Sequence, residues 1–297
     1  MTATPTAAPP LLAPPSRLRR LTAAVGGLPN AEALVGIAVI VVWVVLIAAA
    51  PLIARFGPLT QHIASRLQPP SAVHWFGTDQ LGRDVFARVL YGGRESLPGA
   101  VAVVALGFLA GVSLGALAGY CRGFVDEVVM RFTDIVLAFP LILLAMAVAA
   151  ALGPSLTHGI LALAAVWWPS YARVCRGLVL ELNNKEYVVA SRASGRRSAS
   201  VLVKVILPNA LPALLVMAAI DIGRAILIFS ILGFLGLGAQ PPQPEWGAMV
   251  ATGATVMGDW WVATFPAMPV LTLALAFNLI GDSIRDALDP WVGGRGR

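Results

Sequence analysis

Two opposite charges interrupt a long apolar run in the last third of the chain. Asp221 and Arg224 lie three residues apart within residues 207–237. A charge is costly inside a hydrocarbon core, so charged residues in such runs are candidates for function. Residues three apart share a helix face, and the pair could neutralise itself near the membrane interface. The alternative is that both charges line a polar path across the membrane.

The chain shows no pattern for metal binding or for catalysis. His62, His74 and His158 are scattered, and no cluster of histidine, cysteine and carboxylate residues has metal-ligand spacing. The sequence also contains no G-x-x-x-x-G-K-[ST] phosphate loop and no H-E-x-x-H or G-x-S-x-G motif. We therefore expect no catalytic residue, no metal site and no cofactor bound by this chain.

The composition predicts an all-α, polytopic membrane protein. The 297 residues are 58% hydrophobic and 12% charged, with a mean hydropathy of +0.81, whereas soluble domains carry about 25% charged residues. A helix needs about 20 apolar residues to cross the hydrocarbon core. Six runs predict six transmembrane helices, at about Ala33–Ala54, Leu97–Tyr120, Val128–Leu152, Thr157–Val174, Leu207–Leu237 and Trp260–Ile280.

Two features predict how these helices bend and pack. Small residues recur every fourth position in the second run, so one helix face can let another backbone approach closely; they are Gly107, Gly111, Gly115 and Gly119. Pro140 lies within the third run and predicts a kink there.

The basic residues predict the orientation. The net charge of +6 fits cytoplasmic loops of a membrane protein, and we expect membrane lipid rather than nucleic acid as a partner. With the N-terminus inside, 15 of the 21 basic residues fall in segments on the cytoplasmic side. Both termini are therefore predicted to be cytoplasmic, as is the polar loop 181–206 between the fourth and fifth runs.

That loop reads as a short helix followed by a sharp turn. Residues Glu186–Ala193 form the predicted helix, Gly195 can adopt the positive φ that ends it, and Pro208 suits the start of the next helix. Such a loop is either a stiff element that transmits force or an ordinary solvated connector. The residue pattern alone leaves both interpretations open.

Several long motifs favour the first interpretation. The loop reads "VASRASG", then nine residues, then "VILP", which resembles the E-A-A-x-x-x-G-x9-I-x-L-P loop of the membrane subunits of ATP-binding-cassette importers. Further motifs over residues 73–290 resemble the C-type permeases of dipeptide, oligopeptide and nickel importers; they are "HWFGTDQLGRDVFARVLYG", "VDEVVMRFTDIVLAFP", "WWPSYARVCRG", "DIGRAIL", "FLGLGAQPPQPEWGAM" and "AFNLIGDSIRDALDP".

The resemblance implies a type I ABC importer permease fold and a non-catalytic transport subunit in the bacterial plasma (inner) membrane. Its implied partners are a second homologous permease, one or two cytoplasmic ATPase subunits that bind ATP and Mg, and an extracytoplasmic substrate-binding protein. The implied ATPase-coupling residues are Glu186, Val189, Ala190, Ser191, Gly195, Leu207 and Pro208.

Three positions depart from the family pattern. Ser191 stands where the second alanine of the loop is expected. Val189 stands where the loop glutamate is expected, and Glu186, one helical turn earlier, is a candidate replacement. Phe229 stands where related chains commonly carry a glutamate in the fifth run. A candidate translocation path would then consist of Asp221, Arg224 and Phe229, and the two charges could meet the carboxylate and ammonium of a peptide.

Two polar segments are predicted to be extracytoplasmic, residues 77–84 and 238–247. Their turn residues and tryptophans suit a surface on which a binding protein docks. The candidate docking residues are Gly77, Asp79, Arg83, Asp84 and Trp246. An ordinary interfacial cap is the alternative.

The expected function is therefore ATP-driven import of dipeptides or oligopeptides. A nickel or nickel-chelate permease is the alternative, and an ion-coupled secondary transporter is a further one. The predicted organisation is a disordered cytoplasmic tail at 1–29, the first helix and an extracytoplasmic loop at 33–96, a five-helix permease core at 97–290 and a C-terminal tail at 291–297.

Overall fold

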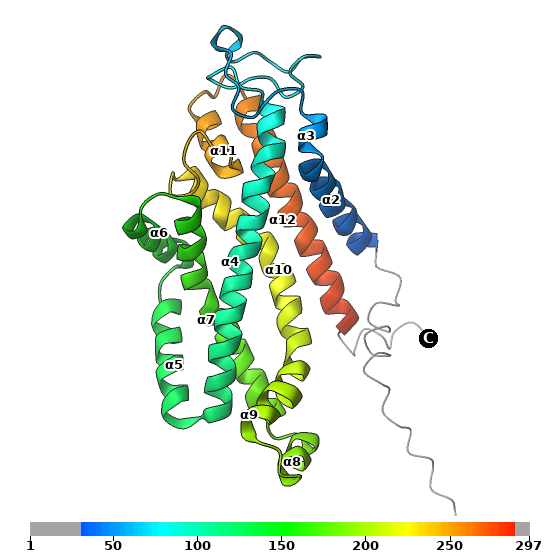
Figure 1. Ribbon diagram of the computed structural model, residues 1–297, viewed down its shortest axis with the longest axis vertical. Coiled ribbons are helices and arrows are strands. Elements are labelled where there is room, and N and C mark those ends of the chain that lie inside the picture. Colours follow the sequence, from blue (N-terminus) through cyan, green and yellow to red (C-terminus); the bar gives the residue numbers. More distant parts are fainter. Residues whose placement is uncertain (1–30, 289–297) are drawn as a thin grey trace, which may run out of the picture.

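The computed structural model describes residues 31–288, and the predicted tails at 1–29 and 291–297 lie outside them. Within the described residues the chain is helical, and its only β-type pairing there is an isolated bridge between Thr78 and Asp84. The long helices run roughly along the long axis of the molecule (Figure 1). The all-α expectation is confirmed.

Four stretches are long and apolar enough to cross a membrane alone. They are α2 (Ala31–Ala48), α4 (Val85–Cys121), residues Ser198–Phe234, which include α10 (Leu207–Phe234), and the part of α12 (Trp261–Leu288) that ends at Ile284. Helices α5 (Gly123–Leu137) and α6 (Leu141–Leu152) qualify only as a pair. The remaining long helix is α7 (Leu156–Leu182), whose 27 residues extend about 40 Å. The six predicted runs correspond to these elements.

The third run differs most from its prediction. A single kinked helix was expected over Val128–Leu152, but α5 and α6 are separate helices bent by 94°. Pro140 lies at the break, where it lacks an N–H and disfavours helical φ and ψ at Phe139. In Figure 1, α6 turns away from the bundle while α5 runs beside α4 and α7.

The second helix begins earlier than predicted. Helix α4 starts at Val85 rather than Leu97, because Asp84 caps it by accepting a hydrogen bond from the Ala87 N–H. The first turns carry charged residues that hide the helix in a hydropathy reading. Helix α4 therefore crosses the proposed boundary between 33–96 and 97–290, and that division stays a prediction.

Helices α4 and α7 pack along the predicted glycine seam. A Cβ at Gly107 would lie 3.0 Å from the Cβ of Trp167, and a Cβ at Gly111 or Gly115 would overlap the backbone of α7. At Gly115 the overlapping atom is the carbonyl oxygen of Ala172. Lipid supplies no hydrophobic drive between helices, so this close backbone approach is what lets the two helices attract.

The two ends of the bundle are built differently. At one end lie α8 (Glu186–Ala193), α9 (Ser198–Val201) and the π-type turn η2 (Leu202–Ile206). At the other end lie α3 (Ala50–Ile53), η1 (Ile63–Ser65) and α11 (Trp246–Ala254), together with the loop 54–84 (Figure 1). The chain enters α2 and leaves α12 at the ends of those helices nearer α8.

A buried carboxylate holds α11 in place. Glu245 is fully buried and caps α11, with Oε1 accepting from the Gly247 N–H at 2.8 Å and Oε2 from the Ala248 N–H at 2.8 Å. Ser96 of α4 donates its hydroxyl to Oε1 at 3.2 Å. A Cβ at Gly233 of α10 would overlap the carboxylate. Glu245 thus joins α4, α10 and α11 at one point.

The close packing of α4 on α7 predicts that one added methyl group in the seam lowers the stability of the protein. Gly115→Ala should lower the free energy of unfolding by roughly 1–3 kcal/mol, because the new Cβ meets the Ala172 carbonyl. Gly177→Ala in α7 is the matched control, since nothing lies within 4 Å of its Cβ. Thermal unfolding in detergent can be followed by thiol labelling of buried Cys175 in a Cys121→Ser background. Equal midpoints for the two variants would contradict the seam.

The environment of Glu245, in the connection between α10 and α12, predicts a pH effect on stability. Burial raises the pKa of this carboxyl, although the N–H groups of Gly247 and Ala248 and the Ser96 hydroxyl act to lower it. The folded state therefore binds the proton more tightly than the unfolded chain. The associated stability is present below the unfolded pKa and is lost as the pH rises through the folded pKa.

Acidification from about pH 7 to about pH 5 should thus stabilise the wild type more than Glu245→Gln. Thermal midpoints of both proteins across that range measure the difference. Glu127→Gln, at an exposed carboxylate, is the control and should follow the wild-type pH dependence. Parallel curves for wild type and Glu245→Gln would refute the assignment.

Candidate functional site

The predicted loop helix forms as expected and is largely exposed. Helix α8 spans Glu186–Ala193, and Gly195 follows with φ of +78°. Among the coupling candidates on α8, Glu186, Val189 and Ala190 are exposed, while Ser191 is half-buried. Apart from its two chain neighbours, no residue described by the structure has an atom within 4 Å of a Cβ built at Gly195. The turn therefore leaves one face of α8 open to the surroundings.

Other residues, which the sequence analysis did not single out, fasten α8 to the bundle. Val188 is fully buried in an apolar cluster with Val179 of α7 and Ile206 of η2. The Arg192 guanidinium hydrogen-bonds Asn183, just after α7, and lies 5.4 Å from the ring centre of Tyr120 in α4. Helix α8 is thus anchored to the ends of α4 and α7. Val188 and Val189 are adjacent and equally apolar, so the sequence gives no signal that distinguishes the buried residue from the exposed one.

Leu207 and Pro208 do not start a separate helix. The helical backbone is continuous from Ser198 to Phe234, and residues Leu202–Ile206 form a π-type turn in which the Leu207 N–H donates to the Leu202 carbonyl. Pro208 follows directly, half-buried, where its missing N–H accommodates the change back to α-helix. The predicted helix start at Leu207 is therefore the place where the helix changes its hydrogen-bond pattern.

Asp221 and Arg224 do not form the direct ion pair that their spacing allowed. Among the described residues no carboxylate lies within salt-bridge distance of Arg224. Asp221 is buried and accepts a hydrogen bond from the indole N–H of Trp167 at 3.1 Å, while the exposed Arg224 lies 5.5 Å from the Trp167 ring centre. The two charges are linked through this α7 tryptophan, which the sequence could not place.

Phe229 lies on a different face of α10. Its side chain is 1% exposed, and its ring would lie 2.9 Å from a Cβ at Gly99 in α4. A Cβ at Gly159 of α7 would also lie 3.8 Å from the ring. Phe229 therefore packs in the core between α4, α7 and α10, and the three path candidates do not share one surface.

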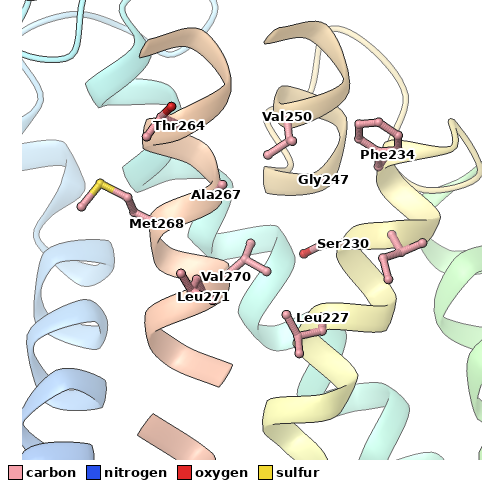
Figure 2. A pocket seen from close by; sticks show the side chains of 11 residues that line it. Leu227, Ser230, Phe234, Gly247, Val250, Thr264, Ala267, Met268, Val270 and Leu271 are labelled. Carbon is pink, nitrogen blue, oxygen red and sulfur yellow. The ribbon is translucent and has the colours of Figure 1, made fainter. Parts of the chain in front are cut away.

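A groove of about 440 Å³ lies between α10, α11 and α12. Its walls are apolar, and Figure 2 shows the side chains facing each other across it. The Ser230 hydroxyl points from α10 toward α12 (Figure 2). The walls include Leu227, Ile231 and Phe234 of α10, Val250 of α11, and Met268 and Leu271 of α12. The sequence analysis did not identify this groove.

The polar docking candidates, at the end of the bundle opposite α8, form a buried network. We call residues 54–84 together with 235–260 the cap. Asp79 forms an ion pair with Arg83 at 2.7 Å and lies 3.6 Å from the Arg88 Nε. Asp84 caps α4 and lies 2.8 Å from His74 Nδ1. The aspartates and arginines of this network are each at most 8% exposed. Because these buried charges contact one another, they hold the cap together.

The other two docking candidates are also structural. Gly77 has φ of +72°, and Trp246 is fully buried with its indole N–H donating to the Val89 carbonyl at 2.9 Å. The expectation that Trp246 lies at a surface is therefore wrong. Exposed apolar side chains of the cap, such as Val73 and Trp75, lie on its surface instead.

Among the described residues, no group of three histidine, cysteine, aspartate or glutamate side chains has the arrangement needed for a metal ion. The arrangement instead comprises an exposed helix at one end, a rigid cap at the other, and a groove and a charged cluster on α10 between them. These parts can bind partners and transmit movement.

Known proteins are similar to this chain in sequence and in fold. A family model described as "Binding-protein-dependent transport system inner membrane component" matches residues 111–294. The probable D,D-dipeptide transport system permease protein DdpC of Escherichia coli K12 is 46% identical over 258 residues, which cover 86% of this chain and 87% of that protein. The dipeptide transport system permease protein DppC of Alkalihalophilus pseudofirmus is 42% identical over 262 residues, covering 88% and 86%.

A solved structure supports the same fold. A chain of the MetNI methionine ABC transporter, in an inward-facing conformation, aligns with a TM-score of 0.55 and 21% identity over 68% of this chain and 96% of that chain. The family model covers more than half of the sequence, and the relatives above exceed 40% identity over most of its length. The chain is therefore a multi-pass transport permease that belongs to the family of inner membrane components of binding-protein-dependent transport systems.

Proposed function

We propose that this chain is a permease subunit of an ATP-driven importer of dipeptides or other small peptides. The named relatives support a peptide substrate, because they are dipeptide permeases and, in another case, a glutathione permease of Escherichia coli that is 46% identical over 76% of this chain. The nickel alternative has no such support.

The observation that carries the proposal is the anchored but exposed helix α8. On the buried side of α8, Val188 packs in the apolar cluster, and near its C-terminal end Arg192 lies over the ring of Tyr120. A push on the exposed side would therefore move the ends of α4 and α7. A solvated connector would not need both attachments. We infer that the exposed face, with Glu186, Val189 and Ala190, docks on a separate ATPase subunit.

The proposed assembly contains a second homologous permease, one or two cytoplasmic ATPase subunits and an extracytoplasmic binding protein. ATP and Mg bind to the ATPase subunits, and this chain contributes no catalytic residue. The binding protein docks on the exposed surface of the cap, and the buried pairs of Asp79 and Arg83 keep that surface rigid. An ion-coupled transporter would use carboxylates along its path as relays. The candidate for that role, Asp221, accepts a hydrogen bond from the indole N–H of Trp167.

The missing loop glutamate has a candidate replacement. Val189 is 53% exposed on α8, and Glu186 lies one turn earlier on the same helix and is also exposed. Residues three apart on a helix share a face, so Glu186 can present its carboxylate beside Val189. We propose that Glu186 provides the acidic contact with the ATPase.

A bulky charge on α8 should uncouple the subunits. Ala190→Arg adds a long cation on the exposed face without filling any buried space, and we expect at least about a tenfold loss of co-purified ATPase and of ATP-dependent dipeptide uptake. Ala64→Arg makes the same change on the exposed surface of the cap and should leave ATPase retention unchanged. Full ATPase retention and uptake in Ala190→Arg would refute the docking role.

The proposed orientation can be read from a native thiol. Cys121 is exposed at the end of α4 nearer α8, whereas Cys175 is buried. A membrane-impermeant maleimide should label Cys121 in inside-out vesicles and not in intact spheroplasts. Gln61→Cys in a Cys121→Ser background places a thiol on the exposed cap and should give the reverse pattern. Labelling of Cys121 in intact spheroplasts would show that the orientation is the reverse of the proposed one.

A further inference from the structure

The groove between α10, α11 and α12 contains a buried hydroxyl for which the described part of the chain offers no partner. Ser230 is 8% exposed, and its Oγ has no hydrogen-bond partner within residues 31–288. Two other helical hydroxyls donate to the carbonyl four residues earlier, Ser113 to Leu109 at 2.7 Å and Thr272 to Met268 at 2.6 Å. The buried hydroxyls of Thr133 and Ser283 also lack a partner among the described residues, but neither lines the groove. The Ser230 hydroxyl is instead directed into the groove (Figure 2). A buried polar group of this kind favours an occupant that can hydrogen-bond.

A cation continues the same face of α10 beyond the groove. Arg224, Leu227 and Ile231 are spaced by three and four residues, so they share one helix face, and all three are exposed. Arg224 lies on the Trp167 ring and has no carboxylate within salt-bridge distance among the described residues. Along this face of α10, the Arg224 guanidinium comes first, the apolar walls of the groove follow, and Phe234 lies at the far end of the groove.

The dimensions of this face suit a short peptide. From Arg224 to Phe234 the helix rises about 15 Å, and an extended dipeptide spans about 7 Å. The groove volume of about 440 Å³ has room for an apolar side chain. An acyl chain by itself would fill the apolar walls but would meet neither the Ser230 hydroxyl nor the Arg224 guanidinium. A peptide offers a side chain, an amide and a carboxylate in one molecule.

We propose that this groove is a substrate subsite within the permease itself. An apolar side chain of the peptide packs between α10 and α12, the Ser230 hydroxyl hydrogen-bonds the peptide amide, and Arg224 meets the terminal carboxylate. The inference rests on the proposed function of peptide import. It makes the permease a second point of selection, after any binding protein that delivers the peptide.

The test compares two peptides in the complete importer. Proteoliposomes holding both permeases, the ATPases and saturating binding protein are supplied with radiolabelled leucyl-leucine or glycyl-glycine. For each peptide, the initial rate of ATP-dependent uptake is divided by the wild-type rate, so any preference of the binding protein cancels. Ile231→Ala should lower leucyl-leucine uptake about tenfold and glycyl-glycine uptake less than about twofold, because only the former fills the apolar wall.

Ser230→Ala should lower the uptake of both peptides about fivefold, because the amide is common to both, and Ser230→Thr should restore it. Leu109→Ala is the control, since Leu109 is 62% exposed on α4, away from the groove. It should leave both rates unchanged.

Four results would overturn the subsite. Equal losses for both peptides in Ile231→Ala would show that the groove does not recognise the side chain, and no loss would show that peptide does not enter it. Loss of the second permease from purified Ile231→Ala complexes would identify the groove as a subunit interface. Wild-type importer that takes up neither peptide would refute the proposed function, and the subsite with it.

Discussion

The close approach of α4 and α7 is the constraint on which the rest of the structure depends. Inside lipid, two helices gain little by burying apolar surface, and close packing of their backbones is a main source of attraction, together with hydrogen bonds between helices. The glycines of α4 allow that contact, with Gly111 and Gly115 against the backbone of α7. One end of this helix pair carries the anchors of α8, namely Tyr120 and Asn183. Its middle carries Trp167, which binds Asp221 and supports Arg224. A shift along this seam would therefore move both sites together.

The two ends of the molecule differ in how rigidly they are held. The cap buries its charged groups beside partners: Asp79 lies between Arg83 and the α4 residue Arg88, and Glu245 lies among N–H donors and the Ser96 hydroxyl. Buried charges of this kind tolerate little movement, because losing one partner leaves the other unpaired in a low dielectric. The α8 end instead exposes its helix and attaches it at few points. A rigid surface suits docking of a partner, and an exposed lever suits transmission of force.

Helix α10 connects these two ends. It follows the π-type turn η2 beside α8, carries Asp221, Arg224 and the groove in its middle, and meets Glu245 through Gly233 near α11. A π-type turn has one residue more per hydrogen-bonded ring than an α-turn, and such turns often occur at functional positions. Movement of α8 can thus reach the groove through one continuous helix. This continuity gives a physical link between the proposed ATPase contact and the proposed peptide subsite.

The sequence alone determined the properties that follow from local chemistry. Apolar run length predicted the membrane helices, Gly195 predicted the turn after Ala193, and the four-residue glycine spacing predicted the seam. Tertiary structure alone decided which distant side chains meet. Spacing allowed Asp221 to pair with Arg224, but Trp167, 54 residues away in the chain, takes the hydrogen bond. Likewise Trp246 is buried and Arg192 reaches Tyr120, because packing between helices selects partners that hydropathy and local spacing do not encode.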